Sequence, residues 1–283
     1  MRIGFLGYGE AARAFHEGLA RPAMSVVVYD RLLPDAAMCG AIISRGATVV
    51  DLQGLADADW IFSAVTADQS LAAAVPLLPH LRQGQVLIDI NSVSPGRKRE
   101  TAAAVEAAGA DYLDMAVMAP VHPRRHQTPV LLAGSIANRI LVELTELGFS
   151  AEIAGEAPGA ATAIKMVRSL FVKGLEAITV EALLAAKASG CFEEIVTSLS
   201  TSFPALGWPD FAAYQLERTT RHGKRRAAEM RESAATLDAL GLSGGLANEI
   251  ASVQDRMGAV GVQTGDNLEQ TVARILAARL KGI

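Results

Sequence analysis

Lys165 is the side chain of this sequence whose type and surroundings best suit proton transfer. It has apolar or small neighbours in an Ala-rich stretch, and Ser169 follows one helical turn later. On a helix, Lys165, Arg168 and Ser169 share one face. Burial of an amine among apolar residues favours its neutral form, which can accept a proton. A surface lysine whose stem covers its neighbours fits the same spacing, so spacing alone leaves both interpretations open.

A second set of residues has the spacing of a turn that binds a dinucleotide. Gly7 and Gly9 follow an apolar run, Ala12 comes three residues later, and Asp30 ends the next apolar run. Gly7 allows a tight turn, Gly9 lets the backbone approach a pyrophosphate, and Ala12 lets a helix pack on the strand. The free N–H groups of that helix favour phosphate. The expected cofactor contacts are Gly7, Tyr8, Gly9, Glu10, Ala11, Ala12, Asp30, Arg31, Ala64, Val65, Thr66 and Asn91.

The residues after the second apolar run bear on the choice between NAD and NADP. The Asp30 carboxylate can accept hydrogen bonds from both ribose hydroxyls and would repel a 2′-phosphate. Arg31 stands beside it, and an arginine there can bind that phosphate. We therefore expect NAD, with NADP possible.

These residues need a parallel sheet to bring them together. The expected strands and helices alternate, which favours a Rossmann-type, doubly wound, mostly parallel sheet covered on both faces. The expected strands are Arg2–Leu6, Ser25–Tyr29, Thr48–Val50, Trp60–Ala64, Val86–Ile90, Tyr112–Met118 and Val130–Ala133. The expected helices between them include Glu10–Ala20, Ser70–Leu81 and Pro95–Ala108.

Ligands bind beyond the carboxyl ends of the strands in such sheets. Those ends carry the segments 64–66 and 91–92 and the loop after Met118, which we expect to face the nicotinamide and its substrate. Pro95 stands in the first turn of the helix after Ser92. Asn91 and Ser92 would suit plain helix capping equally well.

The strand pattern stops near Ala157, and the rest of the chain reads as helices. One helix is expected over Gly159–Ser189, another over Asp210–Leu240, and a final pair ending at Ile283. The sequence thus predicts a dinucleotide-binding domain over 1–157 and an all-α substrate and dimerisation domain over 158–283.

Composition narrows the class of protein. The chain has 283 residues, 51% hydrophobic and 20% charged, with a net charge of −4, which gives no general reason to bind nucleic acid. No apolar run reaches the ~20 residues of a membrane span, and the immediate first strand leaves no room for a signal peptide. Cys39 and Cys191 fit neither a disulfide framework nor a zinc site. We expect a cytoplasmic protein.

Taken together, four motifs resemble the β-hydroxyacid dehydrogenase and 6-phosphogluconate dehydrogenase superfamily. They follow the family's order and cover nearly the whole chain. They are the GxGxxA turn at 7–12, Asn-Ser-x-Ser-Pro at 91–95, Asp-x-x-Val at 114–117 and Lys-Met-Val at 165–167. The resemblance implies an N-terminal Rossmann domain and a helical C-terminal domain that forms a homodimer. It also implies that Lys165 takes the substrate hydroxyl proton as hydride leaves for nicotinamide.

Departures from the family pattern indicate a different substrate. Ser169 stands where the family has an asparagine, and the loop 114–120 lacks the serine and both glycines that grip the substrate carboxylate. Decarboxylating 6-phosphogluconate dehydrogenases carry a glutamate seven residues after the lysine, where this chain has Val172. The phosphogluconate reaction itself is therefore not expected.

Two basic clusters could supply the missing anion anchor, although a solvated surface explains each of them equally well. One is the segment 121–126 after the altered loop. The other is 222–229, in which His222, Arg225 or Arg226, and Glu229 form a polar stripe on a helix. The latter resembles a stretch of a poorly characterised C-terminal domain. The expected substrate-binding residues are Ser92, Met118, His122, His222, Arg225 and Arg226. The histidine spacing suits no zinc site, so no metal is expected.

The sequence predicts an NAD-dependent dehydrogenase of small hydroxy acids or sugar acids, with Lys165 and Ser169 as catalytic residues. The substrate would be anionic. Two alternatives remain. One is a dinucleotide-binding regulatory protein with altered catalysis, and the other is an imine or keto reductase. In the resembling family, imine reducers commonly lack the lysine, so Lys165 weighs against the latter.

Overall fold

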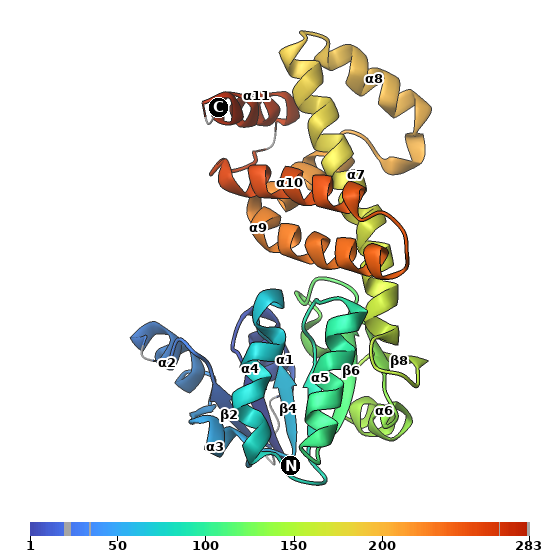
Figure 1. The fold of residues 1–283 in the computed structure, drawn as a ribbon. Coiled ribbons are helices and arrows are strands. Elements are labelled where there is room, and N and C mark those ends of the chain that lie inside the picture. Colours follow the sequence, from blue (N-terminus) through green and yellow to red (C-terminus); the bar gives the residue numbers. More distant parts are fainter. Residues whose placement is uncertain (20–23, 34, 266, 282–283) are drawn as a thin grey trace. The chain divides into compact units, whose positions relative to one another are not determined.

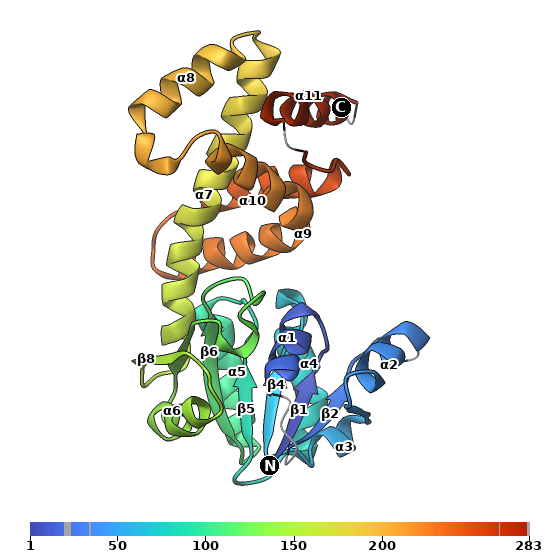
Figure 2. The ribbon, with the colours of Figure 1, turned by 180° about the vertical axis from the view of Figure 1, so that it is seen from behind.

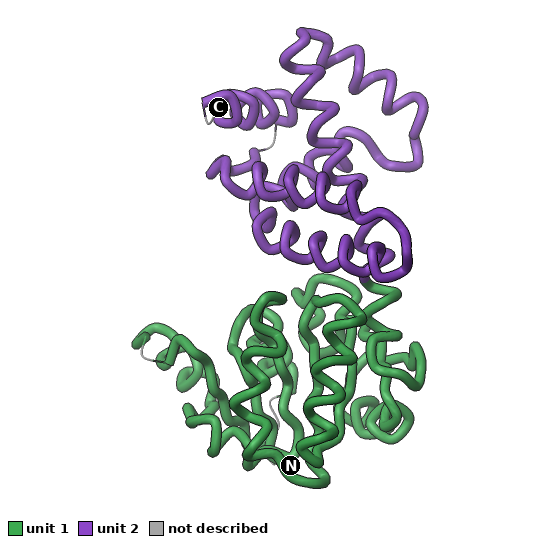
Figure 3. Tube along the Cα trace, viewed as in Figure 1, with its two compact units in different colours: residues 1–165 green, residues 166–283 purple. Residues whose placement is uncertain are grey.

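The computed structural model describes residues 1–19, 24–33, 35–265 and 267–281. Two compact units make up the chain, Met1–Lys165 and Met166–Ile283, drawn in different colours in Figure 3. The division falls inside one long helix. The sequence-based ranges 1–157 and 158–283 put the boundary a few residues earlier, ahead of that helix, and stay a prediction.

The first unit is built on one sheet whose strand order is β3-β2-β1-β4-β5-β6-β7-β8 (Figure 1). All neighbouring strands are parallel except the antiparallel pair β6 and β7. The chain reverses its strand order between β1 and β4, where doubly wound sheets bind dinucleotides. The bounds are β1 Arg2–Leu6, β2 Ser25–Tyr29, β3 Thr48–Val49, β4 Trp60–Ser63, β5 Val86–Asp89, β6 Asp111–Val117, β7 Val130–Ala133 and β8 Ala151–Gly155.

The predicted fold class is confirmed. Each of the seven expected strands forms, with ends that agree to within one residue. The eighth strand, β8, was not expected, because its sequence Ala-Glu-Ile-Ala-Gly lacks the run of branched and aromatic residues typical of strands. It lies at the edge of the sheet, where a weakly apolar strand needs only one neighbour.

Helices cover both faces of this sheet. One face packs against α1 (Glu10–Leu19), α2 (Ala36–Ile43) and α6 (Ala137–Glu146) through a core that includes Phe15, Ile42 and Ile140. The other packs against α3 (Leu52–Leu55), α4 (Ser70–Ala74) and α5 (Pro95–Ala107). Figure 2 shows α1 and α6 from the side opposite to Figure 1. The sheet is therefore buried on both sides, as its continuous apolar strands require.

Proline residues divide one expected helix. The segment predicted as a helix over Ser70–Leu81 forms α4 only to Ala74 and then a 3-10 helix over Val75–His80. Pro76 and Pro79 cannot donate the backbone hydrogen bonds that an α-helix needs in its interior. The expected Glu10–Ala20 helix forms as α1, and its last residue, Ala20, lies outside the described residues.

The second unit contains most of α7 (Ala160–Ala188), then α8 (Phe192–Ser202), α9 (Asp210–Ala239), α10 (Gly245–Ala259) and α11 (Leu268–Leu280). At 1.5 Å per residue, α7 is about 43 Å long. A core including Leu183, Leu216 and Ile250 joins the helices. The predicted helices over 159–189 and 210–240 are thus present, and Ile283, the expected end of the last one, lies outside the described residues. Among the described residues, no helix combines the length and apolarity needed to cross a membrane.

Candidate functional site

The glycine turn after β1 needs a glycine at its first position. Gly7 has φ +87°, a conformation that L side chains rarely adopt, and an added Cβ would lie 2.6 Å from the carbonyl oxygen of Ala64. Its N–H donates to the carbonyl of Tyr29 over 2.8 Å. Gly7 therefore lets the turn run close to the ends of both β2 and β4.

Gly9 and α1 provide the surface that a pyrophosphate needs. A Cβ added at Gly9 would meet no protein atom within 4 Å, so the protein leaves the space beside this residue open. Because Gly9 has no side chain, that space stays free for a ligand. Ala12 is fully buried, which lets α1 pack closely on the sheet. Glu10 is exposed and Ala11 half-buried in the first turn. These residues fit a bound dinucleotide whose phosphates accept from the N-terminal N–H groups of α1.

Tyr8, between the two glycines, points into the protein. Its side chain is fully buried and its Oη lies 2.5 Å from Nδ1 of His16. Burial raises the pKa of Tyr8 to about 12, and burial lowers the pKa of His16. Of the predicted cofactor residues, Tyr8 thus faces the core with its ring, and its N–H donates to Asp30 Oδ2 over 2.7 Å.

Asp30 lies at the end of β2 next to the glycine turn. Its Oδ2 accepts from Tyr8 and its Oδ1 accepts from the N–H of Leu32 over 2.9 Å. These bonds fix the carboxylate, and each oxygen retains a further lone pair for a ribose hydroxyl. Arg31 is exposed.

The segments after β4 and β5 are tied together by Asn91. Its side-chain oxygen accepts from the N–H of Val65 over 2.7 Å, and its Nδ2 donates to Ser63 Oγ over 2.9 Å. Ala64 and Val65 are half-buried, and Thr66 is exposed. Asn91 therefore shapes the predicted cofactor-binding segment from beneath, because it is itself buried.

Ser92 and Lys165 come together in the first unit. The Lys165 Nζ donates to the Ser92 Oγ over 2.6 Å across 73 residues of sequence. Both side chains are half-buried. The sequence predicted each as a site residue separately, and the structure joins them at the carboxyl end of β5.

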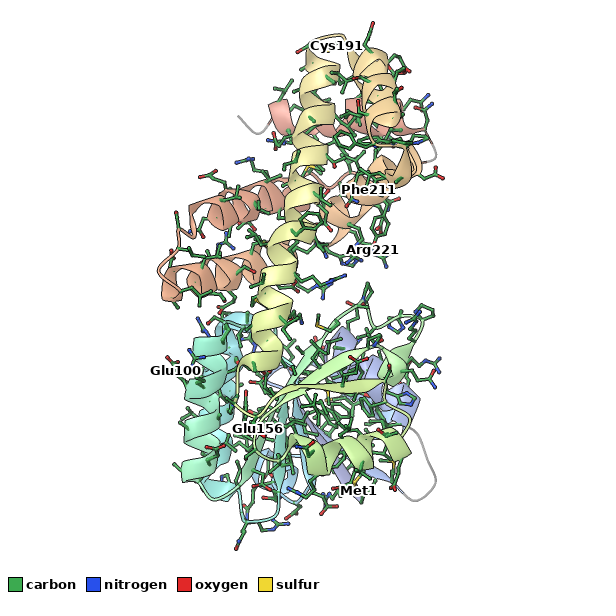
Figure 4. The ribbon with its side chains drawn as sticks, turned by 90° about the vertical axis from the view of Figure 1, so that its right-hand side faces the viewer. Met1, Glu100, Glu156, Cys191, Phe211 and Arg221 are labelled. Carbon is green, nitrogen blue, oxygen red and sulfur yellow. The ribbon has the colours of Figure 1, made fainter. Side chains whose placement is uncertain are left out.

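The first turn of α7 is held on the sheet by Asp114. The Oδ2 of Asp114 accepts from the N–H groups of Gly159 and Thr162, both over 3.1 Å, and its Oδ1 accepts from Thr162 Oγ1 over 2.8 Å. Gly159 has φ +95°, and a Cβ there would lie 2.8 Å from the carbonyl oxygen of Pro95. Figure 4 labels Glu156 in the segment that leads into this turn. Lys165 follows Thr162 by three residues, so Asp114 fixes the start of the helix that carries it.

A buried lysine that sequence reasoning missed lies behind this turn. Lys98 on α5 is fully buried, and its Nζ lies 2.9 Å from Asp89 Oδ1 and 3.3 Å from Asp114 Oδ1. Its charged neighbours in sequence, Arg97, Arg99 and Glu100, suggest a solvated helix face. The signal that could have found it is the pair of aspartates inside the apolar strands β5 and β6, because a buried carboxylate needs a partner.

The two predicted substrate residues after β6 differ in exposure. Met118 is half-buried, and its N–H donates to the carbonyl of Pro129 over 2.9 Å. His122 is exposed. Glu17 on α1 has a lowered pKa, chiefly from its hydrogen bond to Arg45, with a small contribution from His122. The loop thus presents an exposed histidine.

The predicted residues of the second unit have separate surroundings. Ser169 is 7% exposed. Arg226 is buried and forms a two-pronged ion pair with Glu176, so its charge is already neutralised. Arg225 is more than half exposed, 3.8 Å from Glu229, and His222 is half-buried. Arg225 is therefore the arginine of this stripe that can meet an anion from solvent.

Among the described residues, no group of three or more His, Cys, Asp or Glu side chains is placed to hold a metal ion.

Comparison with known proteins decides the family. Residues 2–140 match the NAD binding domain of 6-phosphogluconate dehydrogenase, and residues 186–257 match a domain of unknown function (DUF1932). The chain belongs to the 6-phosphogluconate dehydrogenase-like, β-hydroxyacid dehydrogenase superfamily. A solved structure of a conserved hypothetical protein from Sinorhizobium meliloti 1021 is 34% identical, with 98% of this chain and 96% of that chain covered and a TM-score of 0.77.

Two further members of the superfamily carry a named activity. Mitochondrial 3-hydroxyisobutyrate dehydrogenase of Bos taurus is 25% identical over 52% of this chain and 44% of its own length. The structure of Mycobacterium tuberculosis 3-hydroxyisobutyrate dehydrogenase with L-serine has a TM-score of 0.74 at 17% identity, covering 96% of this chain and 98% of that one. At that identity the structural likeness shows the fold. The superfamily supports a nicotinamide cofactor.

Proposed function

We propose that this protein is an NAD-dependent dehydrogenase of a small anionic hydroxy acid or sugar acid. The observation that carries the proposal is the 2.6 Å hydrogen bond from Lys165 Nζ to Ser92 Oγ. It holds an amine at the carboxyl end of β5, in the same unit as the glycine turn. This is the edge at which a doubly wound sheet binds its ligands.

The proposed chemistry assigns one task to each residue. Bound nicotinamide would accept hydride from the substrate carbinol carbon. Lys165 accepts the hydroxyl proton in the same transition state, because a carbinol releases hydride readily only as it becomes alkoxide-like. Ser92 orients the amine, and Ser169, one turn along α7, bonds to the substrate hydroxyl in place of the family asparagine. Asn91 keeps the cofactor-binding segment in shape.

The anionic group of the substrate is assigned to cations of this chain. Arg225 supplies an exposed guanidinium beside Glu229, with His222 on the same helix face. His122 and Met118 line the altered loop. Arg226 is left out of this assignment, because Glu176 already occupies its guanidinium. Val172, in place of a glutamate, argues against decarboxylation of 6-phosphogluconate.

Asp30 favours NAD over NADP. Its carboxylate is held by the N–H groups of Tyr8 and Leu32 at the end of β2, and a 2′-phosphate there would meet its negative charge. Arg31 next to it leaves NADP as the second cofactor to measure.

The deciding experiment is oxidation of a panel that contains 3-hydroxyisobutyrate, L-serine, D-glycerate and gluconate, with NAD and with NADP. We expect one compound to be turned over with NAD, and Lys165→Ala to lose about 100-fold or more of kcat. Near-normal turnover by Lys165→Ala would contradict the assigned role. The matched control is Lys187→Ala at the other end of the same helix.

Two alternatives give different results on the same panel. A regulatory dinucleotide-binding protein would bind NAD tightly and oxidise nothing. An imine or keto reductase would instead consume NADH or NADPH with cyclic imines or ketones. Lys165 beside Ser92 supports the dehydrogenase over both.

We also propose a homodimer formed by the second unit. Val167, Phe171 and Ile178 recur along one side of α7 and are 55%, 70% and 68% exposed. One apolar stripe on a long helix can pair with its own copy about a two-fold axis. Light scattering should give twice the monomer mass for the wild type and a monomer for Phe171→Asp. A change at exposed Val142 on α6, Val142→Asp, should leave the mass unchanged.

A further inference from the structure

Lys98, the buried lysine of α5, lies between two buried carboxylates that hold different parts of the candidate site. Its Nζ donates to the backbone carbonyl of Asp89 over 2.6 Å and contacts the Asp89 and Asp114 side chains. The three side chains are fully buried. No residue of this group belongs to the predicted site.

Asp89 fixes the segment that carries Ser92. The Asp89 Oδ1 accepts from the N–H of Asn91 over 2.9 Å, and Ser92 is the next residue. Its Oδ2 accepts from the Tyr112 hydroxyl over 2.8 Å. Burial, followed by the charges of Asp89 and Asp114, raises the pKa of Tyr112, so the phenol stays protonated and keeps donating.

Asp114 fixes the segment that carries Lys165. Its bonds to Gly159 and Thr162 hold the first turn of α7, whose positive dipole end offsets the second buried carboxylate. The Lys98 charge thus joins two carboxylates. Asp89 supports the segment that carries Ser92, and Asp114 supports the segment that carries Lys165.

We propose that Lys98 is a positioning residue that keeps Ser92 and Lys165 within hydrogen-bond reach. The inference rests on the proposed role of Lys165 as the proton acceptor. Lys98 itself touches neither substrate nor cofactor. Without Lys98, no cation joins the two carboxylates, and the segments that they hold are no longer tied to each other.

The test uses a variant designed to fold. Lys98→Met leaves two buried carboxylates without their cation, so the main variant is the double change Lys98→Met with Asp114→Asn, which leaves a single carboxylate, as charged overall as the wild-type group. Asp114→Asn alone is the matched variant, because it makes the same change at Asp114 and keeps Lys98. Thr101→Val is the control, because Thr101 is a buried α5 residue that bonds within its own helix, to Arg97.

Two readouts are taken from each variant. One is kcat and KM across pH for the panel compound that the wild type oxidises. The other needs no substrate, because it measures the rate at which acetic anhydride labels Lys165 as a function of pH, with exposed Lys224 as the internal reference. A positioning role predicts a loss of about 10-fold or more in kcat. It also predicts that the Lys165 labelling profile differs from that of the wild type while that of Lys224 stays.

The outcomes separate the two proposals. A Lys165 profile that is the same in the double variant and in Asp114→Asn overturns the positioning role. If the wild type oxidises no panel compound while the Lys165 profile of the double variant still differs from that of Asp114→Asn, the proposed function fails and the positioning role is supported.

Discussion

Ser92 and Lys165 are joined by a 2.6 Å hydrogen bond, although one follows a central strand and the other belongs to the helix that begins after the edge strand. Each is held from behind by a buried aspartate, Asp89 for Ser92 and Asp114 for Lys165. The site is therefore supported by the interior of the first unit, and its dependence on single residues can be measured.

The contact between Ser92 and Lys165 should show in a double-mutant cycle. We expect Ser92→Ala to lower kcat by about 10-fold, Lys165→Ala by about 100-fold or more, and the double variant by hardly more than Lys165→Ala. Once the amine is gone, the hydroxyl has nothing to orient. Losses that multiply fully would show that the two residues act independently.

Glycine substitutions should separate folding from cofactor binding. Gly7→Ala forces a Cβ against Ala64 and strains a positive φ. We therefore expect the free energy of unfolding to fall by about 1–3 kcal/mol and NAD binding to be lost as well. Gly9→Ala meets no protein atom, so the melting temperature should hold while the NAD dissociation constant rises. Gly40→Ala is the control in a helix with open space around it. Equal melting temperatures for Gly7→Ala and wild type would contradict the structure.

The protein should become less stable as the pH falls below neutral, because of His16. Burial lowers the His16 pKa in the folded protein, so the unfolded chain binds a proton that the folded one excludes. The contribution is present above about pH 6.5 and is lost as the pH falls through the folded pKa. Denaturant melts between pH 4.5 and 8 should show a smaller decline for His16→Gln than for the wild type. The same change at exposed His80 should leave the decline as it is.

Substitution of Arg225 should change substrate binding, whereas substitution of its neighbour Arg226 should change stability. Arg226→Ala leaves buried Glu176 without its cation, so we expect a loss of about 3–5 kcal/mol of stability. Arg225→Ala should fold normally and raise KM for the anionic substrate. A normal KM in Arg225→Ala would remove the residue from the proposed substrate site.

Cofactor preference should respond to Asp30 and Arg31 separately. We expect the wild type to bind NAD more tightly than NADP, Asp30→Ser to narrow the difference, and Arg31→Ala to weaken NADP alone. Fluorescence titration of both reduced cofactors measures this. A wild type that prefers NADP would contradict the assignment to Asp30.

Much of the fold could be predicted from the sequence because the strands of the first unit are short apolar runs with glycine or polar ends. The glycine turn and Lys165 could be found in the same way. β8 could not, because Glu152 and Ile153 on an exposed edge carry little pattern. The buried Lys98 was missed because a helical lysine among charged neighbours normally reaches solvent, and only its tertiary partners show otherwise.

The buried ring of Tyr8 has a consequence for engineering. The side chain between the two glycines has to fit the interior of the protein, because the buried Tyr8 hydroxyl contacts His16 on α1. A glycine turn transplanted from a dehydrogenase with another residue in place of Tyr8 would leave His16 without this hydrogen-bond partner. Redesign of cofactor recognition in this chain must therefore exchange Tyr8 and His16 as a pair.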